Sequence, residues 1–258
     1  MCAPSSRLSV SGSFLQQTLP TLWSLKMVLM YGILFIGRKE ITTFFYLYMA
    51  LTMTSLVLDS GVIPPQTGAF PYFVAVQNGF TSALCTCLLV NGFVGFQLYE
   101  DGTTQSVWLL RGSSIGMFII SGGVSILTFK GKAGLGPTNT LGLFVVLYLL
   151  NGIALLVYLV MQIILVANTL QDRWPLGDIS FGVFFFVMGQ VILYVFSDDI
   201  CNAAQHYLDG LFFATICNLL AVMMVYKVSW VKWKLRYALA DWLPSIGIQS
   251  PRRISNSV

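Results

Sequence analysis

The sequence predicts an all-α fold, a polytopic helical membrane protein with six to seven transmembrane helices. Hydrophobic residues make up 56% of the 258 residues, charged residues only 9%, and the mean hydropathy is +0.78. Water-soluble domains carry about 25% charged residues, and a soluble fold of this composition would expose far too much apolar surface. Several uncharged apolar runs also reach the roughly 18 residues that a membrane-crossing helix needs.

Seven segments are candidate spans, of which the first is the weakest. Lys26 interrupts its apolar stretch, and the uninterrupted part, 27–36, is too short to cross a bilayer alone. The six later segments have no ionisable residue in their cores, which argues against a proton- or ion-coupled transporter. The candidate spans lie near residues 20–36, 41–58, 73–98, 112–128, 141–166, 179–196 and 208–226.

Proline and glycine mark the connections between these segments. The connection 59–72 contains Pro64 and Pro65. A glycine-rich stretch that ends in Pro137 precedes the fifth span, and Pro175 precedes the sixth. Such residues favour turns and helix starts over helix interiors, so the punctuation supports these boundaries.

The distribution of lysine and arginine predicts the side of the membrane on which each connection lies. The tail 228–258 is basic, which favours the cytosolic side. Alternating backwards from it, the arginine-containing connections lie in the cytosol, while 59–72 and 197–210, which lack lysine and arginine, lie in the lumen. Only Lys130 and Lys132 fall on the opposite side. The N-terminus is lumenal if the first segment spans and cytosolic if it does not.

The polar residues inside the six later spans are neutral rather than ionisable. In a bundle such residues usually form hydrogen bonds between helices. A second interpretation is that some of them bind polar groups in the transmembrane helices of another protein. The candidate intramembrane polar contacts are Asn91, Asn151, Gln162, Gln190 and Asn218.

The connection 197–210 contains the only histidine and the densest group of carboxylates outside the spans. One interpretation is a solvated acidic loop, and another is a loop that recognises a partner or stabilises the fold. A metal site is a third, but catalytic zinc usually needs three protein ligands, and no HExxH spacing is present. The candidate partner-interaction residues are Asp198, Asp199, Cys201, His206, Tyr207 and Asp209.

Recognisable catalytic motifs are missing from the sequence. It has no GxSxG elbow, no glycine-rich phosphate loop and no Cys–His pair with supporting spacing. We therefore expect no enzymatic activity, no catalytic residues, no cofactor and no metal. A nucleic-acid-binding function is also disfavoured, because no folded basic domain is present to carry it.

Long strings in the sequence match a known family. They are GRKEITTFFYLYM (37–49), PYFVAVQNGFTSALCTCLLVNGFVGFQLYEDGT (71–103), PTNTLGLFVVLYLLN (137–151) and the stretch 171–227. In these strings the chain resembles the fungal chitin synthase export chaperones of the endoplasmic reticulum membrane. The resemblance implies a non-enzymatic, multi-pass chaperone that assists the folding and export of chitin synthase, itself a polytopic enzyme, and thereby cell-wall chitin synthesis. The family offers no catalytic residues to carry over.

The resemblance divides the chain into three parts. Residues 1–36 form a divergent segment with the weak first span, 37–227 form the polytopic membrane domain, and 228–258 form a basic, tryptophan-containing tail. The family continues after this domain with an aromatic and then acidic segment. Val228 and Ser229 fit the reading-through of an intron, so one hypothesis is a retained intron. The alternative is a genuine tail that lies on the cytosolic interface.

Two other functions stay open at this stage. A seven-span receptor or channel fits the topology if the first segment crosses the membrane. A lipid-modifying membrane enzyme would need the acidic loop with His206 to act as a catalytic site. Besides chitin synthase and the lipid bilayer, a homo-oligomeric partner also stays open.

Overall fold

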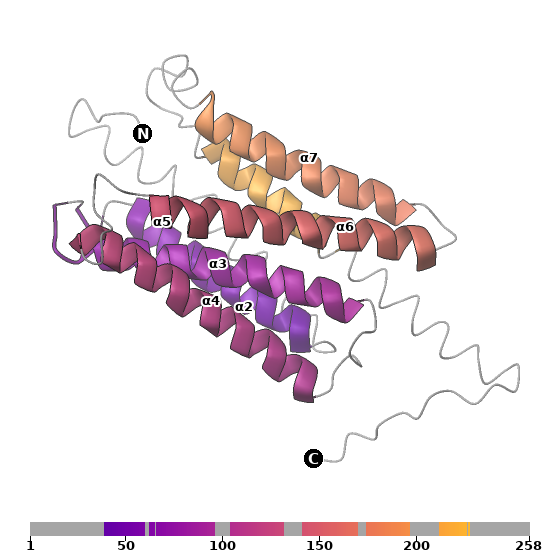
Figure 1. Cartoon of the computed structure of the whole chain (residues 1–258). Coiled ribbons are helices and arrows are strands. Elements are labelled where there is room, and N and C mark those ends of the chain that lie inside the picture. The colour runs from indigo at the N-terminus through magenta and orange to yellow at the C-terminus, as the bar shows by residue number, and fades with distance from the viewer. Residues whose placement is uncertain are drawn as a thin grey trace, which may run out of the picture.

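The computed structural model describes residues 39–59, 62–64, 66–95, 104–131, 141–169, 174–196, 212–225 and 227, and all regular structure in them is helical (Figure 1). The helices are α2 (Lys39–Asp59), α3 (Phe70–Gly95), α4 (Thr104–Lys130), α5 (Leu141–Phe144), the π-helix η1 (Val145–Leu150), α6 (Asn151–Thr169), α7 (Trp174–Tyr194) and the last helix, Phe212–Val225. The predicted all-α class is confirmed for this part of the chain.

Five helical segments are long and apolar enough to cross a membrane. They correspond to α2, α3, α4, the continuous rod of α5, η1 and α6, and α7. The last helix, Phe212–Val225, is apolar but shorter. The candidate first span at 20–36 lies outside the described residues.

Helices α2, α3, α4 and α7 begin earlier than the sequence predicts, by two, three, eight and five residues. α4 starts at Thr104, eight residues before the predicted span, so Arg111 lies inside the helix with its side chain exposed. The charge of Arg111 marks where the apolar run ends, but a helix continues past it at no cost to its backbone hydrogen bonds. α3 starts at Phe70, and Pro71 occupies its first turn, where a missing backbone N–H breaks no helical bond.

α3 is the central helix of the described part. It contacts α2, α4 and α6, and α7 contacts α6 in turn. Figure 1 shows α7 beside the last helix, with α6 between α7 and the group formed by α2, α3 and α4. Buried residues accordingly make up 44% of the apolar window of α3, against 6% in the α5–η1–α6 rod and 11% in α7.

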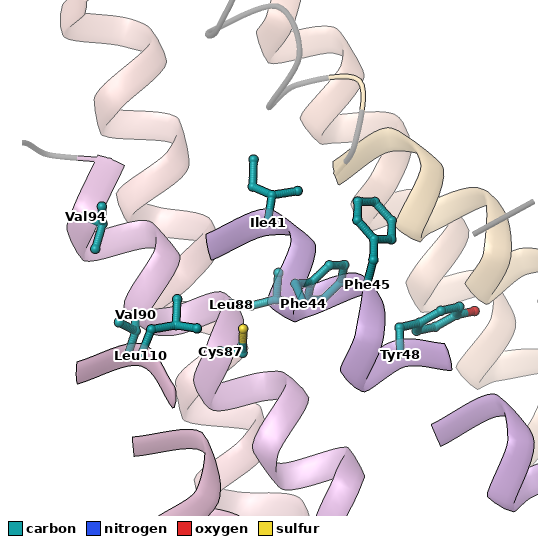
Figure 2. Close-up of a cluster of buried hydrophobic side chains, with 9 residues drawn as sticks. All are labelled: Ile41, Phe44, Phe45, Tyr48, Cys87, Leu88, Val90, Val94 and Leu110. Atoms are coloured by element: carbon teal, nitrogen blue, oxygen red, sulfur yellow. The ribbon is translucent and has the colours of Figure 1, made fainter. Parts of the chain in front are cut away.

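The main apolar cluster joins α2, α3 and α4, and Figure 2 shows its side chains. Leu155 and Tyr158 of α6 and Val222 and Val225 of the last helix pack against it. Between helices in lipid, packing is driven by van der Waals contact rather than by removal of apolar surface from water. The buried members are Ile41, Phe44, Phe45, Tyr48, Cys87, Leu88, Val90, Val94 and Leu110.

Glycine permits several close helix contacts, and the two closest are at Gly79 and Gly189. A Cβ atom on Gly79 of α3 would lie 2.8 Å from the Phe118 ring of α4 and 3.1 Å from the Phe118 carbonyl oxygen. A Cβ atom on Gly189 of α7 would lie 3.1 Å from Cys217 Cβ and 3.3 Å from the Ala214 carbonyl oxygen of the last helix. Small residues of this kind let helix backbones approach in membranes.

Candidate functional site

A chain of hydrogen bonds joins α3, α4 and α6 inside the bundle. Asn151 Nδ2 of α6 donates to Ser82 Oγ of α3 at 3.1 Å, and Ser82 Oγ donates to Ser121 Oγ of α4 at 2.9 Å. Ser121 Oγ then donates back to the Asn78 carbonyl oxygen at 3.2 Å, and Asn78 Nδ2 donates to Ser125 Oγ at 3.1 Å. We call these five residues the polar network. Its three serines are fully buried and Asn151 is 6% exposed.

The polar network can hold three helices in register because each step has one donor and one acceptor. In lipid an unpaired polar group has no water to bond, so exchanging partners is costly. A single interhelical hydrogen bond in a membrane protein contributes about 0.6 kcal/mol on average. The network therefore favours one relative position of α3, α4 and α6 over neighbouring ones.

The π-helix η1 places Asn151 at the start of α6. The backbone N–H of Asn151 donates to the Tyr148 carbonyl oxygen, three residues back. Its side-chain Nδ2 donates to the Leu147 carbonyl oxygen at 2.8 Å, in addition to Ser82 Oγ. Asn151 thus satisfies a backbone carbonyl of the π-helix as well as the neighbouring helix. π-Helical turns inside α-helices occur frequently at functional sites.

Other predicted polar residues also find partners within the described bundle. Gln162 of α6 is 6% exposed and lies beside Gly92 of α3. Asn91 Nδ2 donates to Cys87 Sγ at 3.6 Å, one turn back on the same helix. Gln77, a neutral polar residue of α3, donates from Nε2 to Ser55 Oγ of α2 at 2.9 Å.

Gln190 and Asn218 differ from this group. No hydrogen bond joins Gln190 of α7 to another residue of the described segments. Asn218 Oδ1 of the last helix is buried, with no hydrogen-bond partner among the described residues, and lies 3.4 Å from a Cβ built on Gly189. Two of the predicted intramembrane amides therefore have hydrogen-bonding capacity to spare.

Charged groups of the described residues lie near helix ends. Lys227 Nζ is 2.7 Å from Asp178 Oδ1, which links the end of the last helix to the start of α7. Lys130 Nζ, at the end of α4, lies 5.3 Å from the centre of the Tyr72 ring at the start of α3. The Tyr72 ring attracts the Lys130 ammonium through its negative face, which gives this lysine a protein partner on the side where the charge rule disfavours it.

The predicted partner-interaction residues Asp198, Asp199, Cys201, His206, Tyr207 and Asp209 lie outside the described residues, as does the tail 228–258. Within the described segments, no group of three or more His, Cys, Asp or Glu side chains is placed to hold a metal ion.

The serines of the polar network are functional groups that the sequence reasoning missed. Ser114, Ser121, Ser125 and Thr128 of α4 are all buried and recur at intervals of seven, four and three residues. That spacing places them on one side of an α-helix. It is the feature of the sequence from which a buried polar face on α4 could have been predicted. Serine counts as a weakly polar residue in hydropathy profiles, so the stripe does not interrupt the apolar run.

The comparison with known proteins decides the family. A family model described as chitin synthase export chaperone matches residues 12–233. The chain belongs to the chitin synthase export chaperone family. The match extends beyond residues 37–227, which carry the resemblance in the sequence, at both ends.

Named relatives agree with this assignment. Proteins called chitin synthase export chaperone from Coccidioides immitis, Aspergillus clavatus and Neurospora crassa are 77%, 71% and 71% identical over 192 residues. The alignments cover 74% of this chain, 58% of the first two relatives and 54% of the third. The chain thus spans less than two thirds of the length of these relatives. No solved structure matches it.

Proposed function

We propose that the protein is a non-enzymatic chaperone of the endoplasmic reticulum membrane that assists the folding and export of chitin synthase, and so supports cell-wall chitin synthesis. The observation that supports this most strongly is the 77% identity, over 74% of the chain, with a relative named for this role. The proposal includes no catalytic residue, cofactor or metal.

The structure is suited to such a role on physical grounds. A polytopic client has polar groups inside its transmembrane helices, and lipid cannot satisfy them before the helices assemble. A multi-span helper with neutral polar and small residues can supply temporary hydrogen bonds and close packing. The Gln190 and Asn218 amides, which have no partners for these groups in the described part, are candidates for this exchange. Asn91, Asn151 and Gln162 complete the set of five candidate amides. We propose all five as contacts with the client.

The multi-pass arrangement that we propose has six to seven spans and a cytosolic C-terminus. α4 supports it: Arg111 and Lys130 are nineteen residues apart, about 28 Å along a helix, close to the roughly 30 Å of a hydrocarbon core. The ion pair between Asp178 and Lys227 fits the same cytosolic boundary as Arg111. Protease accessibility of the C-terminal tail in sealed microsomes tests this orientation, and protection without detergent would contradict it.

The connection 197–210 completes the proposal as a lumenal partner-interaction loop. Its carboxylates and His206 are hydrogen-bonding groups that a client segment in the lumen could meet. Exchanging its aspartates for asparagine while retaining the transmembrane helices tests this part separately, since chaperone abundance should stay unchanged and client export should fall.

Deletion of the gene, with chitin synthase followed by a fluorescent tag, tests the proposed function. We expect the synthase to accumulate in the endoplasmic reticulum and to return to the cell surface when this 258-residue chain is expressed again. Normal delivery of the synthase to the surface in the deletion strain, with no related copy present, would contradict the proposal.

A further inference from the structure

Helices α6 and α7 contact each other toward both ends of their shared length. At one end Val166 and Ile179 form a small buried cluster, against which Leu159 and Val183 pack. At the other end the hydroxyl oxygens of Tyr148 in η1 and Tyr194 in α7 lie 3.3 Å apart. The facing stretches between these two contacts are 148–166 of η1 and α6 and 179–194 of α7. We call them the α6–α7 seam.

Gln190 lies on the side of α7 that faces the seam. It follows Val183 by seven residues and precedes Tyr194 by four, and both spacings keep residues on one side of an α-helix. Its side chain is partly buried, and it makes no hydrogen bond with any described residue. A partly buried amide thus points toward a neighbouring helix that does not bond to it.

Gly152 of α6 is at about the level of Gln190 in the register that the two end contacts set. It precedes Leu159 by seven residues and follows Tyr148 by four, and α6 and α7 are antiparallel, as the contacts at the two ends require. A Cβ atom built on Gly152 would meet nothing within 4 Å. Gly152 is exposed, so the surface of α6 is open at this level, in contrast to Gly79 and Gly189, where a Cβ atom would be crowded.

Gln190 shares its lack of a partner with Asn218 Oδ1, whereas three other amides of the described bundle are paired. Asn78, Asn151 and Gln77 all bond to a neighbouring helix. An amide without a partner in an apolar medium costs roughly 2–7 kcal/mol, depending on the reference state. A hydrogen-bonding group supplied from outside the chain would recover part of this cost.

The surface beside the seam has the pattern of a helix-packing face. Leu149, Ile153, Leu156 and Val160 recur at intervals of four, three and four residues and are 51%, 52%, 62% and 46% exposed. This is the spacing by which one helix packs along another. The residues of α6 and α7 that face the seam include no charged side chain, so a neutral partner fits it better than a charged one.

We propose that the α6–α7 seam is the docking site for a transmembrane helix of the client, and that Gln190 hydrogen-bonds to an uncharged polar side chain of that helix. Gly152 leaves room for the side chain, and the exposed aliphatic face of α6 packs along the client helix. The hydroxyl contact between Tyr148 and Tyr194 bounds the site at one end. This inference rests on the proposed function, because it names the place where the client binds.

Co-purification of chitin synthase with the full-length chain from detergent-solubilised membranes tests the docking site. Gln190→Leu keeps the size of the side chain and removes its hydrogen bonds, while Gly152→Leu fills the open surface of α6 at its level. We expect each variant to accumulate normally and to retain its thermal stability. We expect Gln190→Leu to recover about three- to tenfold less chitin synthase, as the loss of one intramembrane hydrogen bond implies.

Two controls make the outcomes distinct. Phe184→Leu changes a residue of α7 that is 55% exposed and lies away from the seam, and it should leave capture unchanged. A second, differently tagged copy of the chain reports self-association. If wild type and Gln190→Leu capture equal amounts of chitin synthase, the docking site is overturned but the proposed function is not. The same holds if the variants lose capture of the second tagged copy and keep capture of chitin synthase. Failure of the wild-type chain to capture any chitin synthase overturns the proposed function with it.

Discussion

The group formed by α2, α3 and α4 and the layer formed by α6 and α7 both contain amides and glycines, but these residues have different surroundings in the two regions. In the first group serines, amides and glycines are matched across helices, through the close contact at Gly79 and through the polar network, which Asn151 of α6 joins from outside the group. In the second layer the amide Gln190 makes no hydrogen bond with a described residue, and a Cβ atom on the exposed Gly152 would meet nothing within 4 Å. Composition alone therefore does not separate a residue that holds the bundle together from one that makes no hydrogen bond within the described part.

The burial of the helices follows the same division. α3 is enclosed by three helices, whereas most side chains of the α5–η1–α6 rod and of α7 lie outside the packed interior. In a membrane an exposed apolar face costs nothing while lipid covers it, so such a face can exchange lipid for a client helix. In the proposed docking, the first group is therefore the scaffold and the second layer is the client side.

The largest effect is expected where a glycine is crowded. Gly79→Ala places a Cβ atom 2.8 Å from the Phe118 ring and near the Phe118 backbone, so α3 and α4 must move apart. Overpacking of this kind typically costs about 1–3 kcal/mol. Thermal unfolding in detergent measures the loss. Gly152→Ala is the matched control, because its Cβ atom has room, and its stability should not fall. Equal destabilisation of the two variants would remove the contrast between the regions.

The next effect concerns the polar network. Asn151→Leu removes the donors to Ser82 Oγ and to the Leu147 carbonyl oxygen. Two lost bonds at about 0.6 kcal/mol each predict a destabilisation of about 1 kcal/mol, seen as a lower temperature of half-maximal aggregation in detergent.

Asn91→Leu is the matched control for this prediction, since Asn91 bonds, among the described residues, to Cys87 on its own helix. We expect it to be close to wild type in stability. An Asn151→Leu protein as stable as the Asn91→Leu protein would show that the network does not hold the three helices together.

A smaller effect is expected at the ion pair that ties α7 to the last helix. Lys227 is 58% exposed and Asp178 18% exposed, so water and salt screen the pair. Exposed pairs of this kind contribute about 0.2–1 kcal/mol. A double-mutant cycle with Asp178→Asn and Lys227→Gln should give a coupling energy in this range that shrinks as salt is raised. A coupling that is insensitive to salt would argue for a pair shielded from water.

The helical class and the position of five apolar helices could be predicted from the sequence because long uncharged runs have one common explanation in a bilayer. Helix ends were harder: α4 begins eight residues before the predicted span, because Arg111 ends the apolar run but not the helix. The π-helix η1 leaves no mark in composition, since Val145 to Leu150 are as apolar as their neighbours.

The candidate site could be predicted only in part. Asn151 and Gln190 could both be predicted as candidate polar contacts, because each is a neutral amide inside an apolar run. Which of them has a partner depends on the distance between helices, and a single sequence does not contain that distance. Ser82 and Ser121 were overlooked because a hydroxyl lowers hydropathy too little to stand out, although their burial makes them the centre of the network.

The most direct test of the division into scaffold and client side is photo-crosslinking in living cells. A photoreactive residue would replace Gln190 on α7 or, for comparison, Ile120 on the outer side of α4, which is 52% exposed. We expect crosslinks to chitin synthase from position 190 and to no specific protein from position 120. Crosslinks to the synthase from position 120, or from both positions alike, would contradict it.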